Sequence, residues 1–502
     1  MRDMTLFEVR KLFPDWTGED DISFDRRVSS ICFDSRKLQI DCVFVAIRGE
    51  KSDGHKFLAD AARAGAIGIV CEDPSGIPAM YKGTVVKVKN TREALNRLAS
   101  HYYGQPSEQL FCVGVTGTNG KTTVSNMVEA ILTKIGKPTG VIGTIDHHLG
   151  GKIWKSEMTT PDPVSFQSRL AEFLDRGAKA LSMEVSSHAL SQSRVDEVSF
   201  DVALFTNLSR DHLDYHKDME DYFDAKKKLF TELLRRSKKP EPTAVVNVDD
   251  EYGKRLKVLP GVRVWSYGMD EDCNLRFEVL EQGFAGTRFR LRGPDRRMHH
   301  FHIRMPGLHN VYNAVCAVGA GLAAGASLED CASALETLGG VKGRLESVQN
   351  RSDLHIFVDY AHTDGAIETV LKYLRGIRDS AGLKNKIITV FGCGGDRDKG
   401  KRPLMMKAAE QGSDLVILTS DNPRTEDPNQ IIKDALAGAT SESVGKTVFT
   451  EPDRREGIRR AIEIASPGDV ILIAGKGHED YQQIGTTKHP FSDVEVVKEI
   501  LK

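Results

Sequence analysis

Residues 115–124 read Val-Thr-Gly-Thr-Asn-Gly-Lys-Thr-Thr-Val and lie between two apolar segments of different spacing. The segment before them, residues 110–115, is short and almost continuously apolar, which is typical of a buried strand. After them, apolar side chains recur three and four residues apart from Val124 to Leu132, which is typical of a helix. The sequence therefore predicts a glycine-rich loop that joins a strand to a helix.

A loop of this kind can surround a polyphosphate with backbone N–H groups and the N-terminus of the following helix. Lys121 can neutralise the outer phosphate oxygens, and the Thr122 hydroxyl can bind the accompanying Mg²⁺. The usual phosphate loop has a glycine where this chain has Val115, and here the glycine is Gly117. An ordinary glycine turn that caps a helix is the alternative, but the strand, lysine, threonine and helix together favour a compressed phosphate loop. We therefore expect a protein that consumes ATP.

Composition limits the other classes. The 502 residues exceed what one hydrophobic core normally supports, so we expect roughly two to four domains. The formal net charge of -2 gives no general attraction to nucleic acid or to an acidic membrane. Eight cysteines occur singly, the N-terminus has acids where a signal peptide needs an apolar stretch, and no run reaches membrane-spanning length. We expect a cytoplasmic protein, a monomer, with no nucleic-acid partner and no membrane insertion.

Strand-like and helix-like segments alternate along the chain, which predicts an α/β protein of three domains. The expected N-terminal domain, residues 1–106, is a small α/β domain with strands at 42–47, 66–71 and 84–88 and helices at 56–64 and 91–103. The central ATPase-like domain, 107–339, has parallel strands at 141–145, 180–185, 202–206 and 244–248, and the Rossmann-like C-terminal domain, 340–502, has strands at 354–358, 387–391, 415–419 and 470–474. Residues 104–107, Gly-Gln-Pro-Ser, break the pattern just before the phosphate-loop strand and predict a hinge or linker, and glycine content alone predicts a second hinge at 339–343.

Polar residues follow several of these strands, where open parallel sheets bind ligands. Glu184, near the end of the strand at 180–185, could reach a magnesium ion beside the phosphate loop, or it could cap the next turn. His212 follows the strand at 202–206 and would suit a second magnesium ion, although a histidine in such a place is more often a surface residue with satisfied hydrogen bonds. These two residues are candidate metal ligands.

Lys226 begins a run of three lysines on a helix expected over residues 222–234. The default interpretation of such a run is a solvated cationic face. An ammonium group would also repel a magnesium cluster. Lys226 could therefore assist only as an anion, for example after carbamylation by carbon dioxide, a role that local chemistry alone does not suggest.

Arginines gather after two strands of the C-terminal domain. Arg424, in Asp421-Asn422-Pro423-Arg424, could bind a carboxylate through its planar guanidinium, whereas Asp-Asn-Pro alone is also ordinary turn chemistry. Arg397 and Arg402 lie in a dense charge cluster after a glycine-rich turn, where exposed salt bridges are the competing interpretation.

Five sequence blocks together resemble the Mur ligases of bacterial cell-wall synthesis, and the resemblance covers nearly the whole chain in the family's order. The blocks are residues 116–122, 183–188, 207–212, 307–314 and 359–362. The compressed phosphate loop is similar to the family's own version. One departure is visible, because the family usually has a proline after the residue that corresponds to Thr363, where this chain has Asp364.

Within that family, Asp421-Asn422-Pro423-Arg424 resembles the signature of members that add meso-diaminopimelate to UDP-N-acetylmuramoyl-L-alanyl-D-glutamate. Diaminopimelate is essentially lysine with an extra carboxylate, for which Arg424 offers a bidentate partner. The resemblance implies a ligase of peptidoglycan precursor synthesis, with ATP as cosubstrate and Mg²⁺ as cofactor. The implied reaction activates the glutamate carboxylate as an acyl phosphate, which the amine then attacks. Three domains would hold the UDP end, ATP and the amino acid, and their closure would exclude water.

The resemblance also implies the roles of individual residues. The implied ATP-binding residues are Gly117, Thr118, Asn119, Gly120, Lys121, Thr122, Thr123, Asn310 and Arg344, and the implied metal ligands are Thr122, Glu184, His212 and carbamylated Lys226, of which the last three and Lys121 would be catalytic. The UDP-substrate would contact Ser35, Thr159, Thr160, Ser186, Gln192 and Arg194. Diaminopimelate would contact Arg397, Asp421, Asn422, Pro423, Arg424, Gly475 and Glu479.

Two kinds of alternative stay open. The first is a ligase with the same activation chemistry, either a lysine-adding relative or a protein similar to folylpolyglutamate synthase. Arg424 and the Thr159-Thr160-Pro161-Asp162 block argue against each of these two ligases. The second is a nucleotide-dependent switch without ligase activity. A switch would hydrolyse ATP without requiring a second and a third substrate.

Overall fold

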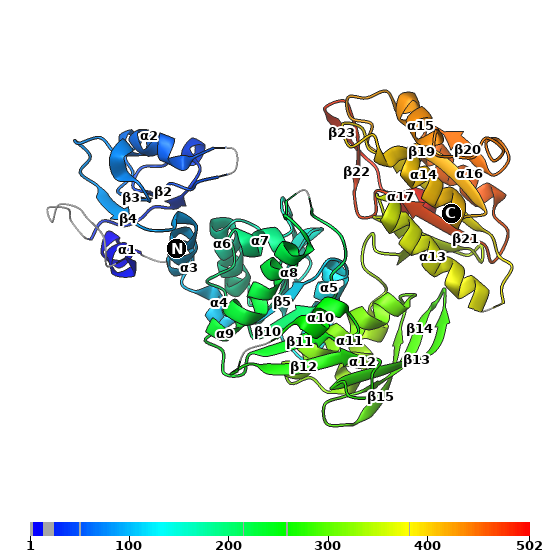
Figure 1. Ribbon diagram of the computed structural model, residues 1–502, viewed down its shortest axis with the longest axis horizontal. Helices are drawn as coiled ribbons and strands as arrows, with labels where there is room; N and C mark the ends of the chain where they lie inside the picture. Colours follow the sequence, from blue (N-terminus) through cyan, green and yellow to red (C-terminus); the bar gives the residue numbers. More distant parts are fainter. Residues whose placement is uncertain (1–3, 14–24, 50–51, 214, 258–259, 381) are drawn as a thin grey trace. The chain divides into compact units, whose positions relative to one another are not determined.

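The computed structural model describes residues 4–13, 25–49, 52–213, 215–257, 260–380 and 382–502. They form two compact units, the first of residues 1–276, 293–296 and 313–331 and the second of residues 277–292, 297–312 and 332–502. Three larger β-sheets with their helices are distributed over these units, in the blue, the cyan-to-green and the yellow-to-red parts of the chain (Figure 1). The α/β class and the three-domain architecture are confirmed, whereas the domain boundaries at 106 and 339 stay a prediction.

The N-terminal sheet has four parallel strands in the order β1-β2-β3-β4. The strands are Ile31–Cys32, Val43–Val45, Gly68–Cys71 and Thr84–Lys87, and the helices are α1 (Leu6–Leu12), α2 (Leu58–Arg63) and α3 (Thr91–Tyr102). Val43 and Val45 pack with α1 and α3, whereas Phe44 packs with α2 on the other face. Successive side chains of β2 point to opposite faces of the sheet, and all of them are apolar, so helices cover both faces.

The central sheet has the strand order β15-β14-β13-β12-β11-β10-β5-β9-β6-β7-β8. Its strands are β5 (Phe111–Thr116), β6 (Thr139–Ile142), β7 (Asp146–Leu149), β8 (Lys152–Lys155), β9 (Ala180–Glu184), β10 (Val202–Phe205), β11 (Thr243–Asn247), β12 (Arg263–Gly268), β13 (Leu275–Gly283), β14 (Gly286–Arg292) and β15 (Met298–Ile303). Its helices are α4 (Pro106–Gln109), α5 (Lys121–Lys134), α6 (Pro163–Asp175), α7 (Ser187–Ser191), α8 (Met219–Lys228), α9 (Leu234–Arg236), α10 (Glu251–Arg255), α11 (Leu308–Ala323) and α12 (Leu328–Thr337).

Strand β5 lies between β9 and β10 and is parallel to both. The chain leaves β5 toward β6, returns to β9 and then crosses to β10 on the opposite side of β5, so the strand order reverses at this point. Open α/β sheets bind ligands outside the carboxyl ends of the strands at such a reversal. The loops that follow β5, β9 and β10 therefore meet at one edge of the sheet.

One predicted strand is too long. Residues 141–145 were expected to be extended, but β6 ends at Ile142. The backbone turns at Gly143, where an added Cβ would lie 2.5 Å from Glu184 Oε1. The turn lets the Thr144 N–H donate to the same carboxylate at 2.8 Å, so a polar contact across the sheet edge ends the strand.

The C-terminal sheet has the order β16-β17-β21-β18-β19-β20, and all neighbours from β17 to β20 are parallel. Its strands are β16 (Glu346–Ser347), β17 (His355–Asp359), β18 (Ile387–Cys393), β19 (Leu415–Ser420), β20 (Val448–Glu451) and β21 (Val470–Ala474), with a separate hairpin of β22 (Tyr481–Ile484) and β23 (Thr487–Pro490). Its helices are α13 (Asp364–Ser380), α14 (Lys401–Gly412), α15 (Pro428–Leu436), α16 (Arg454–Ile464) and α17 (Asp493–Ile500).

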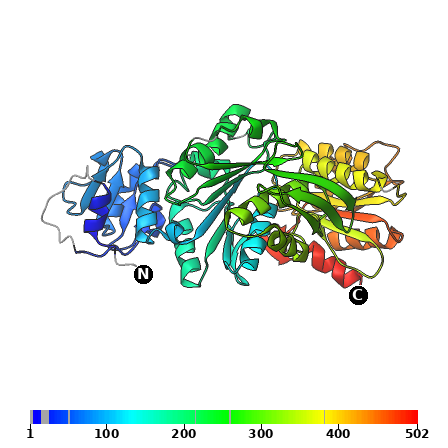
Figure 2. The same cartoon turned by 90° about the horizontal axis from the view of Figure 1, so that it is seen from below.

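The strands of this sheet are apolar on both sides, as buried parallel strands require. Along β21, Val470, Leu472 and Ala474 pack with α13 to α15, and Ile471 and Ile473 pack with α16 and α17. The yellow helices α13 and α14 and the red helix α17 accordingly lie on opposite faces of the sheet (Figure 2). This continuous apolar character is the reason that the sequence located β17, β18, β19 and β21 closely.

The departure from the family at Asp364 leaves the local helix intact. Helix α13 begins at Asp364, and the Thr363 hydroxyl accepts a hydrogen bond from the Ala366 N–H at 3.3 Å. Thr363 therefore caps the helix, and a proline is not required at the next position.

Arg454 and Asp493 form an ion pair inside the C-terminal domain. The guanidinium donates to both carboxylate oxygens at 2.7 Å, and both side chains are fully buried. Arg454 also donates to the Ala474 carbonyl at 3.0 Å, which links helix α16 to the end of β21.

Replacement of Asp493 by asparagine is expected to destabilise this domain by about 3–5 kcal/mol, because it leaves a buried guanidinium without its counter-ion. Chemical denaturation measured by the fluorescence of a probe in the C-terminal domain would test this. Glu495→Gln, which changes an exposed carboxylate on the same helix, is the matched control and should change stability by less than about 0.5 kcal/mol. A wild-type midpoint for Asp493→Asn would contradict the expectation.

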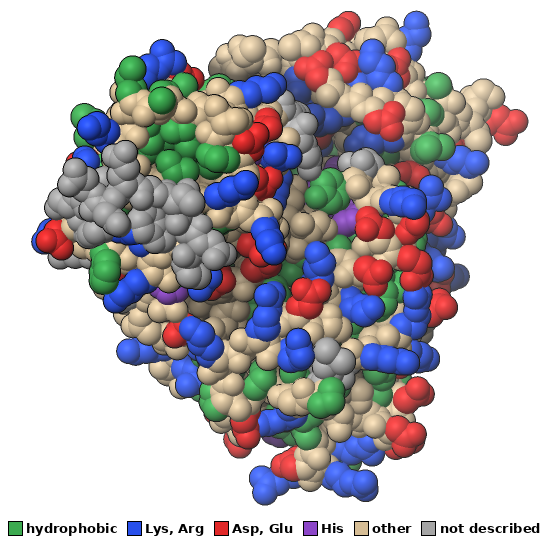
Figure 3. Space-filling model, turned by 60° about the vertical axis from the view of Figure 1, so that its left-hand side comes forward, with side chains coloured by type: hydrophobic (Ala, Val, Ile, Leu, Met, Phe, Trp, Pro, Cys, Tyr) green, Lys and Arg blue, Asp and Glu red, His purple; other side chains and the backbone are tan. Residues whose placement is uncertain are grey.

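The distribution of charged side chains on the surface agrees with the low net charge of the chain. On the face drawn in Figure 3, Lys and Arg side chains are interspersed with Asp and Glu side chains rather than gathered by sign. Among the described helices, none has both the length and the apolar character needed to cross a bilayer. All eight cysteines are free and buried.

Candidate active site

The loop between β5 and α5 has the tight backbone that the sequence predicts. Gly117 and Gly120 have φ values of 148° and 86°, which L side chains rarely adopt. A Cβ on Gly117 would lie 1.9 Å from Thr206 Oγ1, and that hydroxyl donates to the Asn119 carbonyl at 2.6 Å. The loop is therefore held against the segment that follows β10.

The Lys121 side chain lies over this loop. Its Nζ donates to the carbonyls of Gly117 at 2.9 Å and Thr118 at 2.7 Å. Because Lys121 is also the first residue of α5, the ammonium and the helix N-terminus place positive charge at the same end of the loop. Thr122 and Thr123 follow in the first helical turn and are buried.

Glu184 lies directly beside the helix start. Its buried carboxylate accepts hydrogen bonds from Thr122 Oγ1 at 2.9 Å, from the Thr144 N–H at 2.8 Å and from Thr144 Oγ1 at 3.0 Å. Glu184 does not cap the next turn, because Ser186 caps α7. The alternative role that the sequence left open is therefore wrong.

The oxygen donors of Thr122 and Glu184 fit Mg²⁺, which prefers hydroxyl and carboxylate ligands and usually keeps phosphate and water in its remaining positions. Within the described part of the chain, no three His, Cys, Asp or Glu side chains are grouped so as to hold a metal ion by themselves. A site of this kind would need the nucleotide phosphates to complete it.

The default interpretation of Lys226 as part of a solvated face is wrong. The side chain is buried, with 1% of its surface exposed, and its Nζ donates to the Gly117 carbonyl at 2.9 Å. Burial, with a smaller contribution from the positive charge of Lys121, lowers the pKa of Lys226 well below its usual value. The helix continues into a π-helical turn at Leu229–Leu233, a feature that is frequent at functional sites.

His212 lies on the same side of the loop. Its ring centroid is 5.1 Å from that of His188 and 5.9 Å from that of Tyr222, and 43% of its side chain is exposed. The Tyr222 hydroxyl lies 3.2 Å from Thr118 Oγ1, and Lys226 Nζ lies 4.5 Å from the centre of the Tyr222 ring. Tyr222, which the sequence did not indicate as a site residue, thus joins His212, Lys226 and the phosphate loop.

Five of the six predicted UDP-substrate residues form one hydrogen-bonded network. Arg194 donates to the Thr160 carbonyl at 2.9 Å and to Gln192 Oε1 at 2.6 Å, and the Ser186 N–H donates to Thr160 Oγ1 at 3.1 Å. The network reaches the predicted metal site, because the Thr159 and Thr144 hydroxyls lie 3.0 Å apart and Thr144 contacts Glu184.

Among the described residues, the sixth, Ser35, is not part of this network. It begins a 3₁₀ turn, Ser35–Lys37, after β1 in the N-terminal sheet. Asp34 caps the turn by accepting from the Arg36 N–H at 3.1 Å, and the Arg36 side chain holds the pKa of Asp34 at about 2.

In the C-terminal sheet, the loops after β18, β19 and β21 meet as their order predicts. Gly394 lies among the residues that are predicted to bind the amino-acid substrate. A Cβ on Gly394 would lie 3.1 Å from Arg424 Nη1, 3.6 Å from Arg397 Cγ and 4.0 Å from Asp421 Oδ2. Gly475 is close to the same point, since its Cβ would lie 3.7 Å from the Gly392 carbonyl oxygen. Exposed salt bridging does not describe Arg402, which is fully buried and pairs with Glu426 at 2.8 Å.

Arg424 is held by the β22–β23 hairpin. Its N–H donates to the Gln483 carbonyl at 3.1 Å, its carbonyl accepts from the Gly485 N–H at 2.7 Å, and its guanidinium donates to the Gly395 carbonyl at 2.7 Å. These contacts fix Arg424 at a φ of 52°, which is unusual for a residue other than glycine. The segment is thus more than an ordinary turn, and the hairpin that supports it was not recognised from the sequence.

Asn310 and Arg344 belong to the second unit. Asn310 Nδ2 donates to the Pro306 carbonyl at 2.8 Å, and Arg344 lies over the Tyr360 ring at 5.5 Å from its centre. Asn313, one turn after Asn310 on α11, belongs to the first unit, and a Cβ on Gly120 would lie 2.3 Å from its Oδ1. Asn313 is therefore a further residue beside the phosphate loop.

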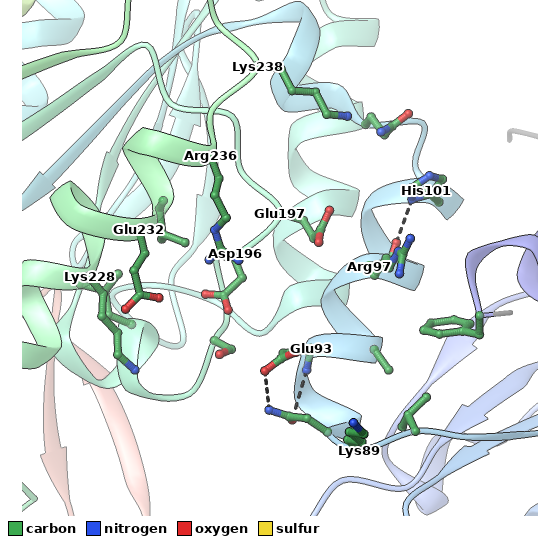
Figure 4. Close-up of a pocket in the computed structure, with 18 residues that line it drawn as sticks. Lys89, Glu93, Arg97, His101, Asp196, Glu197, Lys228, Glu232, Arg236 and Lys238 are labelled. Carbon is green, nitrogen blue, oxygen red and sulfur yellow. Dashed lines mark hydrogen bonds between the residues drawn. The ribbon is translucent and has the colours of Figure 1, made fainter. Parts of the chain in front are cut away.

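A cavity of about 730 Å³ lies between α3 and the segments around residues 193–197 and 228–238 (Figure 4). Cationic and acidic side chains both line it, namely Lys89, Arg97, Lys228, Arg236 and Lys238 with Glu93, Asp196, Glu197 and Glu232. Burial raises the pKa of Asp196, which lies opposite Arg236. The charges nearly balance, so the lining indicates no particular class of ligand.

The phosphate loop, the carboxylate beside its helix and the arginine-lined loops of the C-terminal sheet define a nucleotide-dependent α/β enzyme. Three family descriptions match successive parts of the chain: "Mur ligase family, catalytic domain" at residues 27–103, "Mur ligase middle domain" at 115–321 and "Mur ligase, glutamate ligase domain" at 343–477. The chain belongs to the Mur ligase family.

Curated relatives match over nearly their whole length. UDP-N-acetylmuramoyl-L-alanyl-D-glutamate--2,6-diaminopimelate ligase of Geobacter metallireducens is 46% identical over 487 residues, which cover 94% of this chain and 93% of the relative. The protein of the same name from Aquifex aeolicus is 44% identical over 482 residues, which cover 96% and 95%.

Solved structures agree with these relatives. A structure of UDP-N-acetylmuramoyl-L-alanyl-D-glutamate--2,6-diaminopimelate ligase matches with a TM-score of 0.72 and 31% identity, covering 100% of this chain and 99% of that one. The MurF ligase from Thermotoga maritima in complex with ADP shares the fold, with a TM-score of 0.58, 18% identity and coverage of 94% and 97%.

Proposed function

We propose that this protein is an ATP-dependent ligase that adds meso-diaminopimelate to UDP-N-acetylmuramoyl-L-alanyl-D-glutamate in peptidoglycan precursor synthesis. The observation that supports this most directly is the close approach of Arg424, Arg397 and Asp421 around Gly394, in a chain that is 46% identical to a 2,6-diaminopimelate ligase. Guanidinium and carboxylate groups at one point suit an amino-acid end, which has both a carboxylate and an ammonium group. We place the reaction in the cytoplasm and expect a monomeric enzyme.

The first step activates a carboxylate. The terminal glutamate carboxylate of the UDP-substrate attacks the γ-phosphorus of ATP, the bond to ADP breaks, and an acyl phosphate forms. Two anions must approach each other, so Lys121 and the N–H groups of the loop neutralise charge as it moves to the ADP oxygens. Thr160, Ser186 and Arg194 orient the UDP-substrate beside Glu184, because the Thr160 hydroxyl donates to the Glu184 backbone carbonyl at 2.8 Å and contacts with Ser186 and Arg194 hold Thr160 in place.

Mg²⁺, held by Thr122 and Glu184 with His212 and Lys226 nearby, would supply further neutralisation of the phosphate oxygens. In this proposal Lys226 acts as a carbamate. Its neutral amine adds to carbon dioxide and releases one proton, which gives a carbamate anion that could bind a metal ion. The lowered pKa of Lys226 supports this step, because only the unprotonated amine reacts.

The second step forms the amide. The unprotonated amine of diaminopimelate attacks the acyl phosphate carbon, a tetrahedral intermediate forms, the nitrogen loses one proton, and phosphate leaves. Arg424 and Arg397 bind the distant carboxylate, and Asp421 and Glu479 receive the ammonium group at the same end. Selectivity over lysine then depends on that extra carboxylate.

Closure of the domains would protect the acyl phosphate from water. Of the second predicted hinge, Gly343 is fixed, since its carbonyl accepts from the Tyr360 N–H at 2.9 Å and its N–H donates to Glu346 Oε2 at 2.8 Å. Cβ atoms on Gly339 and Gly340 would meet nothing within 4 Å. We therefore place the pivot at Gly339 and Gly340.

The purified protein, given ATP, Mg²⁺ and the UDP-dipeptide, is expected to release phosphate with meso-diaminopimelate at least about a hundredfold faster, in kcat/KM, than with L-lysine. Mass spectrometry of the tripeptide product would identify the amino acid added. Phosphate release without the dipeptide would instead indicate a nucleotide switch, and equal use of lysine would refute the assignment of the amino acid.

A further inference from the structure

Lys476 is a buried cation among the loops that surround Gly394. It follows β21, between two glycines with positive φ, and none of its side-chain surface is exposed. Its Nζ donates to Glu479 Oε2 at 3.0 Å, to Asn422 Oδ1 at 3.2 Å and to Asp421 Oδ1 at 3.5 Å. The ammonium group thus donates to three predicted amino-acid-binding residues, which come from two different loops.

These contacts determine the orientation of the Asn422 side-chain amide. Its Oδ1 accepts from Lys476 Nζ and from the Gln483 N–H, the latter at 2.8 Å. The Nδ2 group is consequently directed to Glu479 Oε2, to which it donates at 2.8 Å. One oxygen of Glu479 is therefore fixed by two donors, Lys476 and Asn422.

Lys476 also balances charge. Asp421 and Glu479 are two carboxylates near one another, and Asp493 adds a third negative charge, while the positive charge of Arg454, like that of Lys476, acts on Asp421. Burial raises the pKa of Asp421, and the positive charge of Lys476 opposes that rise. Without Lys476, the carboxylates would repel each other and one of them would tend to take up a proton.

We propose that Lys476 is a positioning residue for the amino-acid substrate, holding Glu479 and Asn422 in place so that ionised carboxylates receive the substrate's ammonium group. The proposal deepens the function proposed above and rests on it. Lys476 makes no contact with the reacting amine in this account. Its removal should affect the binding of one substrate out of three.

Steady-state kinetics of Lys476→Met test the proposal. KM for diaminopimelate is expected to rise about thirtyfold, because charge-assisted hydrogen bonds to two binding residues are lost. KM for ATP and for the UDP-dipeptide should stay within about twofold of wild type, since both substrates bind elsewhere. Lys476→Arg keeps the charge and should recover part of the loss. Lys498→Met, which removes an exposed lysine on α17, is the matched control and should behave as wild type.

A double-variant cycle separates positioning from simple folding damage. If Lys476 acts through Glu479, the rise in KM for diaminopimelate caused by Glu479→Gln should be much smaller in the Lys476→Met background than in wild type. An unchanged KM for diaminopimelate, a parallel rise of all three KM values, or full additivity would each overturn the proposal. Should Lys476→Met fail to fold, Lys476→Arg and Lys476→Gln provide the same comparison of KM values.

Failure of this inference is distinguishable from failure of the proposed function. The wild-type protein alone decides which amino acid is added. If that amino acid is lysine, the proposed function is wrong, and the Lys476 variants can still be compared with lysine as substrate. If it is diaminopimelate and the Lys476 variants bind it normally, only the positioning role is wrong.

Discussion

Replacement of Lys226 by alanine is expected to lower kcat by about a thousandfold or more, with the protein still folded. The amine lies 2.9 Å from the Gly117 carbonyl, inside the phosphate loop, and has lost its access to water. A permanent ammonium there would be poorly solvated and would repel Mg²⁺, whereas a carbamate would add a metal-binding anion where phosphoryl transfer occurs. Phosphate release measured with saturating substrates tests the expectation.

The carbamate, rather than the lysine itself, is tested by rescue. Formate or acetate at high concentration should restore part of the activity of Lys226→Ala by supplying a carboxylate in the vacated space. Lys226→Arg should stay inactive, because a guanidinium is not carbamylated. Lys227→Ala removes the neighbouring lysine, which pairs with Asp224 at 3.3 Å, and should retain wild-type kcat. An active Lys226→Arg variant would refute the carbamate.

The residues at strand ends were predictable from the sequence for a physical reason. Parallel buried strands are continuously apolar, so their carboxyl ends can be located, and adjacent strands bring those ends together. Glu184 and the loop at Lys121 were found in this way, because β9 and β5 are neighbours. Arg424 and Gly475 follow β19 and β21 in the same manner.

Other site residues had no such signal. Lys226 belongs to a lysine triplet, and only the fold shows that one of the three points inward. Thr144 contacts Glu184 because β6 ends early, which local sequence does not indicate. The support of Arg424 by Gln483 depends on a hairpin some sixty residues later in the chain, and pairing over that separation leaves no local pattern. Lys476 lies directly after Gly475, which the resemblance implied as a binding residue, but no role was predicted for Lys476 itself.

Replacement of Arg424 by alanine is expected to lower kcat/KM for meso-diaminopimelate by about a hundredfold to a thousandfold. A carboxylate that enters beside Gly394 gives up its hydration, and loss of a partly buried guanidinium leaves that charge unpaired. Arg424→Lys should recover only part of the loss, since a point charge cannot make two parallel hydrogen bonds. Competition between diaminopimelate and lysine, followed by mass spectrometry, measures the effect.

The same variant separates selectivity from catalysis. Slow turnover with L-lysine should be unchanged in Arg424→Ala, because lysine has no second carboxylate to lose, so the preference for diaminopimelate should fall by the full factor. Arg455→Ala, which removes an exposed guanidinium paired with Glu499 at 2.6 Å, is the matched control and should keep wild-type selectivity. If diaminopimelate and lysine lose activity equally in Arg424→Ala, the guanidinium supports the loop rather than the substrate, and the selectivity must come from another residue.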